Sequence, residues 1–324
     1  MKQLIVLLII LSSTVKVEAQ NLTNESKRHI IDAISFHLKD KYVFPDIALS
    51  MEADLLKRWQ VGEYDHIVDK NIFADSLKNH LYMVSKDKHI GVSYNEVMAS
   101  RLREPKEDPT EEFNRINDRV RKFNYGFEEL KIMEGNVGYL KLGGFAPTKY
   151  AGKTASSAMQ FLSNSDALIV DLRDNMGGDD SMIQLLISYL YSEKPVRLNN
   201  FYHKEGDETT QLWTLPYVEG SRMPDIPVYV LINEKTISAG EEFAYDLKHL
   251  KRAKIIGETS AGAANFGEEF VVYGDFIAWI PTGRAINPIT KTNWEGKGVE
   301  PHINVKSVDA LDTAYQLAKE ALNE

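Results

Sequence analysis

Apolar runs alternate with segments of helical periodicity between residues 137 and 257, and this alternation constrains the fold more than any other feature. The runs suited to buried strands are Val137–Leu142, Ala167–Leu172, Val228–Ile232 and Lys254–Gly257. The helical patterns between them lie near Ala151–Leu162, Met182–Tyr191 and Ser238–His249. Such alternation is typical of βαβ units, so an α/β fold is predicted, with a largely buried mixed sheet flanked by helices. The later segments predict short strands near Phe270–Tyr273 and Phe276–Pro281 and an amphipathic helix from Ala310 to Leu322.

The residues before this domain divide into three segments. Residues 1–19 combine a basic start, an apolar run and small residues at a cleavage site, which predicts a secretory signal peptide. The apolar run is well short of the ~20 residues that span a bilayer, so no stable membrane insertion is expected. Residues 20–100 show helical spacing and are predicted to form a small N-terminal helical unit. Residues 101–124 are interpreted as a polar linker with one short exposed helix, leaving 125–324 for the α/β domain.

Composition and missing motifs exclude several classes of function. The 324 residues contain no cysteine, which removes disulfides, thiolate metal sites and cysteine nucleophiles. The formal net charge is −9 and no basic patch with interleaved aromatic residues occurs, so no nucleic-acid partner is expected. No H-E-x-x-H, dinucleotide or P-loop motif occurs, so neither a metal nor a cofactor is expected. An exported chain without cysteine favours the periplasm or exterior of a bacterium.

A pair of glycines follows one of the predicted buried strands. The sequence DLRDNMGG ends in Gly177 and Gly178. A lone Gly-Gly pair most often forms only a tight turn. Its exposed backbone N–H groups could instead stabilise an oxyanion, so both readings stay open at this point.

A serine opens the helix that follows another buried strand. Ser238 in TISAGEEF is either a helix N-cap or a nucleophile placed in the positive potential of a helix N-terminus. In the second case the N–H of Ala239 would point at the oxygen of an attacked carbonyl. Glu241 lies three residues after Ser238, and we expect its carboxylate beside the serine, with Glu242 pointing elsewhere.

Spacing alone does not select a partner for this serine. His89, in the loop sequence SKDKHIGV, enters a strand at the end of the helical unit. A lone histidine is usually structural or solvated, and the other seven have no comparable setting. The residues alone therefore do not identify the general base for Ser238.

Four ordered motifs together carry a family resemblance. They are DLRDNMGG at 171–178, TISAGEEF at 236–243, GETSAG at 257–262, and NP with NWEGKGVEP at 287–301. The chain resembles the C-terminal processing (tail-specific) serine peptidases, in the branch that contains the repeats of interphotoreceptor retinoid-binding protein and the tricorn protease core. The resemblance implies a ClpP/crotonase-like catalytic core over residues 125–324.

The resemblance also implies roles for the candidate residues. Ser238 would be the nucleophile, and the oxyanion hole would use the N–H of Ala239 and that of Gly177 or Gly178. In the branch that lacks the usual lysine, His89 would be the base. Glu241 would orient a catalytic group or the substrate.

Two differences from the family pattern limit which family properties can be expected of this chain. The family's catalytic lysine position, 25 residues after Ser238, is occupied by Ala263, so the base is either His89 or a displaced lysine. The lysines considered are Lys248, Lys251 and Lys254. Residues 95–125 are also too few for the PDZ domain of many members, so a PDZ groove is not expected to select substrate tails.

The function expected on these grounds is that of an exported serine endopeptidase. It would cleave unstructured or hydrophobic peptides, or protein tails, by acyl transfer through a Ser/His site. The alternative is a module without catalytic activity that binds a lipid or retinoid-like ligand or sequesters a peptide on the same fold.

Overall fold

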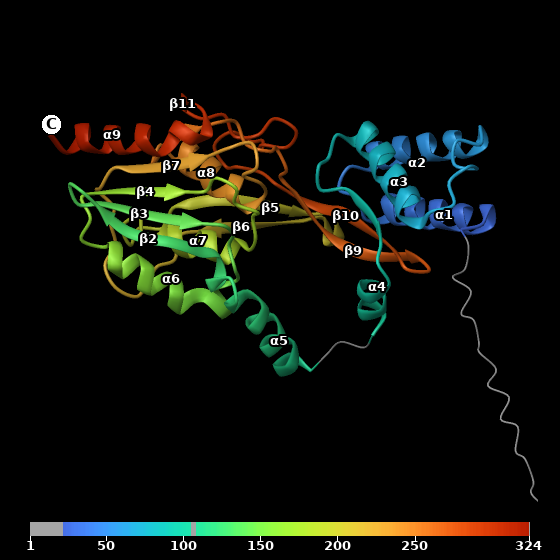
Figure 1. Ribbon diagram of the computed structural model, residues 1–324, viewed down its shortest axis with the longest axis horizontal. Coiled ribbons are helices and arrows are strands. Elements are labelled where there is room, and N and C mark those ends of the chain that lie inside the picture. Colours follow the sequence, from blue (N-terminus) through green and yellow to red (C-terminus); the bar gives the residue numbers. More distant parts are fainter. Residues whose placement is uncertain (1–21, 105–107, 324) are drawn as a thin grey trace, which may run out of the picture.

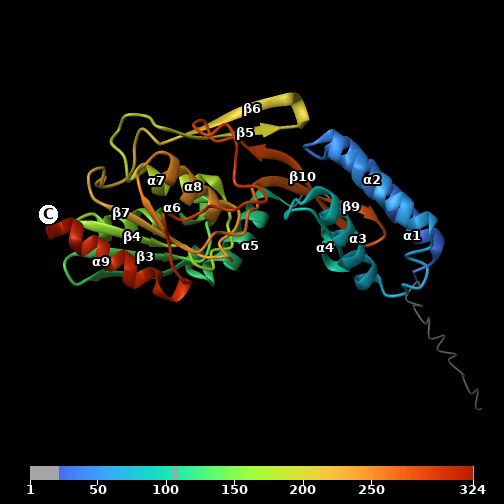
Figure 2. The same cartoon turned by 90° about the horizontal axis from the view of Figure 1, so that it is seen from above.

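The computed structural model describes residues 22–104 and 108–323. An α/β body and an N-terminal helical unit lie side by side and are bridged by long strands (Figures 1 and 2). The expected signal peptide falls outside the described residues. Within the described ranges, no helix combines the length and apolar character needed to cross a membrane.

A six-stranded sheet forms the centre of the α/β body. Its strand order is β11-β8-β7-β4-β3-β2. The bounds are β2 Phe127–Met133, β3 Val137–Leu142, β4 Ala167–Asp171, β7 Val228–Ile232, β8 Lys254–Gly257 and β11 Ile303–Asn304. The pairs from β11 to β3 are parallel and β2 pairs antiparallel with β3, so the sheet is mixed.

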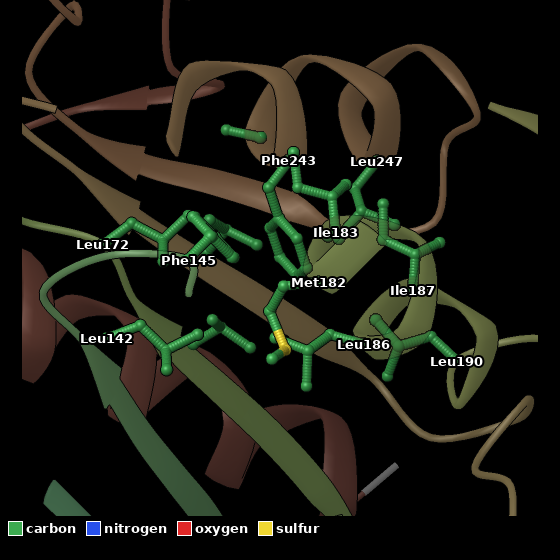
Figure 3. Close-up of a cluster of buried hydrophobic side chains, with 14 of the residues drawn as sticks. Leu142, Phe145, Leu172, Met182, Ile183, Leu186, Ile187, Leu190, Phe243 and Leu247 are labelled. Carbon is green, nitrogen blue, oxygen red and sulfur yellow. The ribbon is translucent and has the colours of Figure 1, made fainter. Parts of the chain in front are cut away.

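Helices cover both faces of this sheet because its strands are apolar on both sides. The helices are α6 Thr148–Leu162, α7 Asp180–Ser188, α8 Ala239–His249 and α9 Ala310–Asn323. Alternate strand residues such as Leu168 and Val170 pack with α6, α7 and α8, whereas their neighbour Ile169 packs with α9. Figure 3 shows Phe243 and Leu247 of α8 within the first of these cores. This packing anchors the helix that begins after Ser238.

A second sheet connects the body to the N-terminal unit. Its order is β1-β10-β5-β6, with β9 paired to β10. The bounds are β1 Gly91–Tyr94, β5 Arg197–His203, β6 Glu208–Trp213, β9 Asn265–Tyr273 and β10 Phe276–Ala285. Phe276, Ala278 and Ile280 of β10 lie in the core of the N-terminal helices, so the hairpin of β9 and β10 fixes the two parts together.

The core of the N-terminal unit is formed by three long helices, α1 Asn24–Lys41, α2 Pro45–Gln60 and α3 Lys70–Ser85. Two further helices, α4 Glu96–Arg103 and α5 Pro109–Arg121, follow before the α/β body begins. Short 3₁₀ helices lie at Asn124–Gly126, Glu205–Asp207 and Ser307–Asp309. No residue of α5 is buried, as expected of an exposed helix between two packed parts.

The predicted fold class is confirmed, and four strands, β2, β5, β6 and β11, were missed. The apolar runs at β3, β7 and β8 predicted these strands with the bounds that the structure shows. β2 and β6 lack such runs because most of their residues are exposed. β9 and β10 extend beyond their predicted ranges, since long parts of them are paired in the second sheet rather than buried in the first.

Candidate active site

Ser238 stands between a buried strand and a helix. β7 ends at Ile232, a turn of six residues that ends in Ser238 follows, and α8 begins at Ala239. Ser238 has φ 57° and ψ −122°, a region that residues other than glycine rarely adopt. Such strain persists only where the surroundings enforce it, which makes Ser238 a functional candidate.

The two glycines lie against this serine. β4 and β7 are parallel neighbours, so the turns after them meet at one edge of the sheet. Gly177 has φ 81°, and a Cβ there would come within 2.8 Å of the Ser238 Cβ. Gly178 has φ 142°, and a Cβ there would lie 2.1 Å from the Phe145 carbonyl oxygen. Both positions therefore require glycine.

The backbone N–H groups of these glycines differ in their hydrogen bonding. The Gly177 N–H donates to Asn175 Oδ1 at 2.8 Å. Within the described part of the chain, the N–H groups of Gly178 and Ala239 have no acceptor. Gly178, Ala239 and Ser238 line the same cavity, so the N–H of Gly178, unlike that of Gly177, is available there to a bound acceptor.

Glu241 is a buried acceptor beneath the serine. Its Oε2 accepts hydrogen bonds from the N–H groups of Ser238 and Ala263, both at 2.9 Å. Its Oε1 accepts from the Ser260 hydroxyl at 2.6 Å and the Gly262 N–H at 2.5 Å. Burial raises the pKa of Glu241, and these hydrogen bonds oppose the shift. Glu241 thus ties the start of α8 to the loop of residues 260–263.

His89 reaches the Ser238 cavity from the N-terminal unit. His89 lies between α3 and β1, and its backbone N–H donates a hydrogen bond to Asp87 Oδ1 at 2.9 Å. Its Nδ1 is buried and has no hydrogen-bond partner among the described residues. Burial lowers the pKa of His89, whereas the Asp87 charge opposes this. The imidazole is therefore neutral near pH 7 and able to accept a proton.

Two carboxylates that the sequence did not indicate surround this histidine. A ring nitrogen of His89 and carboxylate oxygens of Asp87 and Glu295 all lie within 4.8 Å of one another. Burial, followed by the Asp87 charge, raises the pKa of Glu295 to about 7. A divalent cation could use these three ligand atoms. Each carboxylate already accepts hydrogen bonds: Asp87 from the Tyr42 hydroxyl and the Asn265 amide, Glu295 from three backbone N–H groups.

The displaced lysines are not at this site. Lys248, Lys251 and Lys254 line a different cavity, together with His302. The Lys248 ammonium donates to the Glu300 carbonyl at 2.6 Å. The structure thus brings His89, and none of these three lysines, to the cavity of Ser238.

The cavity beside Ser238 has a volume of about 310 Å³ and contains an unexpected acid. Phe201, Phe266 and Trp294 form aromatic walls, and Glu242 also lines the space. The expectation that Glu242 points elsewhere is therefore wrong. Positions three and four residues along a helix both share a face with the first, so spacing did not distinguish the two glutamates.

Two family models match parts of this chain. The model of peptidase family S41 matches residues 136–305, and that of the N-terminal domain of S41 peptidases in eukaryotic IRBP matches residues 19–125. The carboxy-terminal processing protease CtpB of Bacillus subtilis (strain 168) is 25% identical over 206 residues, which is 60% of this chain and 39% of that protein. The chain spans less than half the length of the first curated relatives that it matches.

Solved structures share the fold over most of the chain. The photosystem II D1 C-terminal processing protease has a TM-score of 0.54 at 15% identity and covers 87% of this chain and 93% of its own. The tricorn protease has a TM-score of 0.61 at 13% identity, covering 93% of this chain and 37% of its own. These similarities concern the fold, and the family assignment rests on the family model, which covers more than half of the residues. The chain therefore belongs to peptidase family S41.

Proposed function

We propose that this chain is an exported endopeptidase that cleaves unstructured peptides or protein tails by acyl transfer to Ser238. The observation that carries the proposal is the meeting of Ser238 and His89 in one cavity, although 149 residues of sequence separate them. Export rests on the signal-peptide pattern of residues 1–19.

The proposed reaction assigns each group one task. Ser238 Oγ attacks the scissile carbonyl while His89 accepts its proton, and the protonated imidazole then donates that proton to the leaving amine. Water subsequently attacks the acyl-enzyme, with His89 again acting as base. The N–H groups of Ala239 and Gly178 stabilise the oxyanion, because both are free of other acceptors and lie beside the serine.

Asp87 and Glu295 are proposed as positioning residues for His89. The Asp87 carboxylate lies close enough to stabilise the imidazolium that forms during proton transfer, and Glu295, with its pKa raised to about 7, adds to this effect in its ionised form. Their own hydrogen bonds hold them in place. Glu241 is proposed to act through Ser238, by holding the strained backbone at the start of α8.

The alternative of lipid or retinoid-like binding is not favoured by this cavity. A buried carboxyl group, that of Glu242, lines its wall, and an apolar ligand would leave that group without a polar partner. The cavity suits a peptide with polar or charged atoms better than a hydrocarbon chain.

Cleavage of an unstructured protein such as reduced, carboxymethylated casein tests the proposal. The parent chain should produce fragments, and Ser238→Ala should lose about 10⁴-fold or more in kcat. Ser50→Ala changes an exposed serine on α2 and should keep full activity. Undiminished cleavage by folded Ser238→Ala would contradict the proposal.

A further inference from the structure

The cavity beside Ser238 contains a buried acid that is not paired with a lysine or an arginine. Glu242 is only 6% exposed and lies one helical turn after Ser238, on the same face of α8. Its Oε1 accepts a hydrogen bond from Asn199 Nδ2 at 3.2 Å, and its other oxygen has no hydrogen-bond donor among the described residues. No lysine or arginine is among the residues that line the cavity.

A second buried acid lies one turn further along the helix. Asp246 is fully buried; its Oδ1 accepts from Asn287 Nδ2 at 3.1 Å, whereas its Oδ2 is without a partner in the described part of the chain. Burial raises the pKa of Glu242 to about 8, and burial with the Glu242 charge raises that of Asp246. Two buried carboxyl groups without a cation are costly, so their retention needs a reason.

The remaining walls suit a long side chain with a charged end. Phe201 and Phe266 pack edge to face with ring centroids 5.7 Å apart. Trp294 is 2% exposed, and its Nε1 is already used by the Ala263 carbonyl, which leaves its ring as an apolar surface. Asp179 and Asp180, both less buried than Glu242, add two further carboxylates to the lining. Aromatic faces with carboxylates favour a cation on an alkyl stem.

We propose that this cavity receives the substrate side chain on the acyl side of the scissile bond and selects lysine or arginine there, with Glu242 as the residue that pairs with the cation. The inference rests on the proposed function, because the side chain next to the attacked carbonyl must lie beside Ser238. Entry of the cation supplies the partner that the buried acid lacks in the free protein. The alkyl stem packs against the wall that Phe201 and Phe266 form.

Peptides that differ only at this position test the proposal. We expect kcat/KM for lysine and arginine to exceed that for the uncharged norleucine by about 10- to 100-fold, and glutamate to be the poorest. In Glu242→Gln the ratio of lysine to norleucine should fall toward one. Glu234→Gln, on the exposed turn before Ser238, should leave this ratio unchanged.

The outcomes separate the two proposals. Cleavage with equal kcat/KM for norleucine and lysine would overturn the selectivity while leaving the peptidase function intact. Absence of any cleavage, together with absence of fluorophosphonate labelling at Ser238, would overturn both. If Glu242→Gln does not fold, the peptide series on the parent chain decides by itself, and Asp180→Asn, at a more exposed lining residue, should also reduce the preference for lysine.

Discussion

Replacing Glu241 by glutamine should destabilise the chain as well as impair turnover. Two hydrogen-bond donors meet at each of its oxygens, and an amide can present only one oxygen. If the amide nitrogen takes the place of Oε2, the N–H groups of Ser238 and Ala263 lose their acceptor. If the amide nitrogen takes the place of Oε1, the Gly262 N–H loses its acceptor. Either way the variant buries unsatisfied donors.

The magnitude follows from the number of donors left without an acceptor. One or two buried N–H groups at about 1–3 kcal/mol each, with weaker hydrogen bonds to the remaining oxygen, give a loss of about 3 kcal/mol. Urea unfolding followed by circular dichroism measures this difference. The strained backbone of Ser238 should also relax, so kcat/KM should fall in the molecules that remain folded.

Glu242→Gln provides a matched control, because its expected effect on the free energy of unfolding is opposite to that of Glu241→Gln. The acid has a pKa of about 8 in the folded chain against an ordinary value of 4.5, so at pH 7 folding carries a cost that glutamine avoids. The variant should be neutral or more stable, by up to about 3 kcal/mol at pH 7. Equal destabilisation by both substitutions, or none by Glu241→Gln, would refute the assigned role of Glu241.

Three further outcomes follow from the geometry. His89→Ala should be nearly as inactive as Ser238→Ala in peptide assays with its fold intact, and the double variant should be little worse than either, because the two residues act as one unit. Gly177→Ala should lower both stability and activity, since the added Cβ would lie 2.8 Å from the Ser238 Cβ at a positive φ; wild-type values for both would contradict the close approach. The raised pKa of Glu242 means that the parent chain loses stability as pH rises from about 4.5 to 8, by up to about 1.4 kcal/mol per unit, relative to Glu242→Gln; parallel pH profiles would contradict this.

The sequence predicted those elements whose residues are buried on both faces. β7, with five buried residues, has an unbroken apolar run and was predicted with its observed bounds. β6 was missed because five of its six residues are exposed and its sequence, ETTQLW, lacks alternation. Such strands are specified by pairing with distant segments, here β5, rather than by their own pattern.

The residues of the candidate site also differ in whether a local sequence pattern indicated them. Ser238 and the glycines were indicated because each follows a recognisable strand. His89 came only with the family resemblance, and Glu295 was not found, because it meets the histidine loop across 207 residues of sequence through the Lys88 N–H. Contacts of that range depend on the packing of β10 into the N-terminal unit, which no local pattern reveals.

Covalent labelling with a fluorophosphonate, mapped by peptide mass spectrometry, tests most directly whether Ser238 is an activated nucleophile. One adduct is predicted, on Ser238, with a labelling rate that falls about 10²-fold or more in His89→Ala, where the proton acceptor is missing. Glu234→Gln, on the exposed turn, should label at the parent rate. A folded chain that remains unlabelled, or one labelled at another serine such as Ser260, would contradict the account.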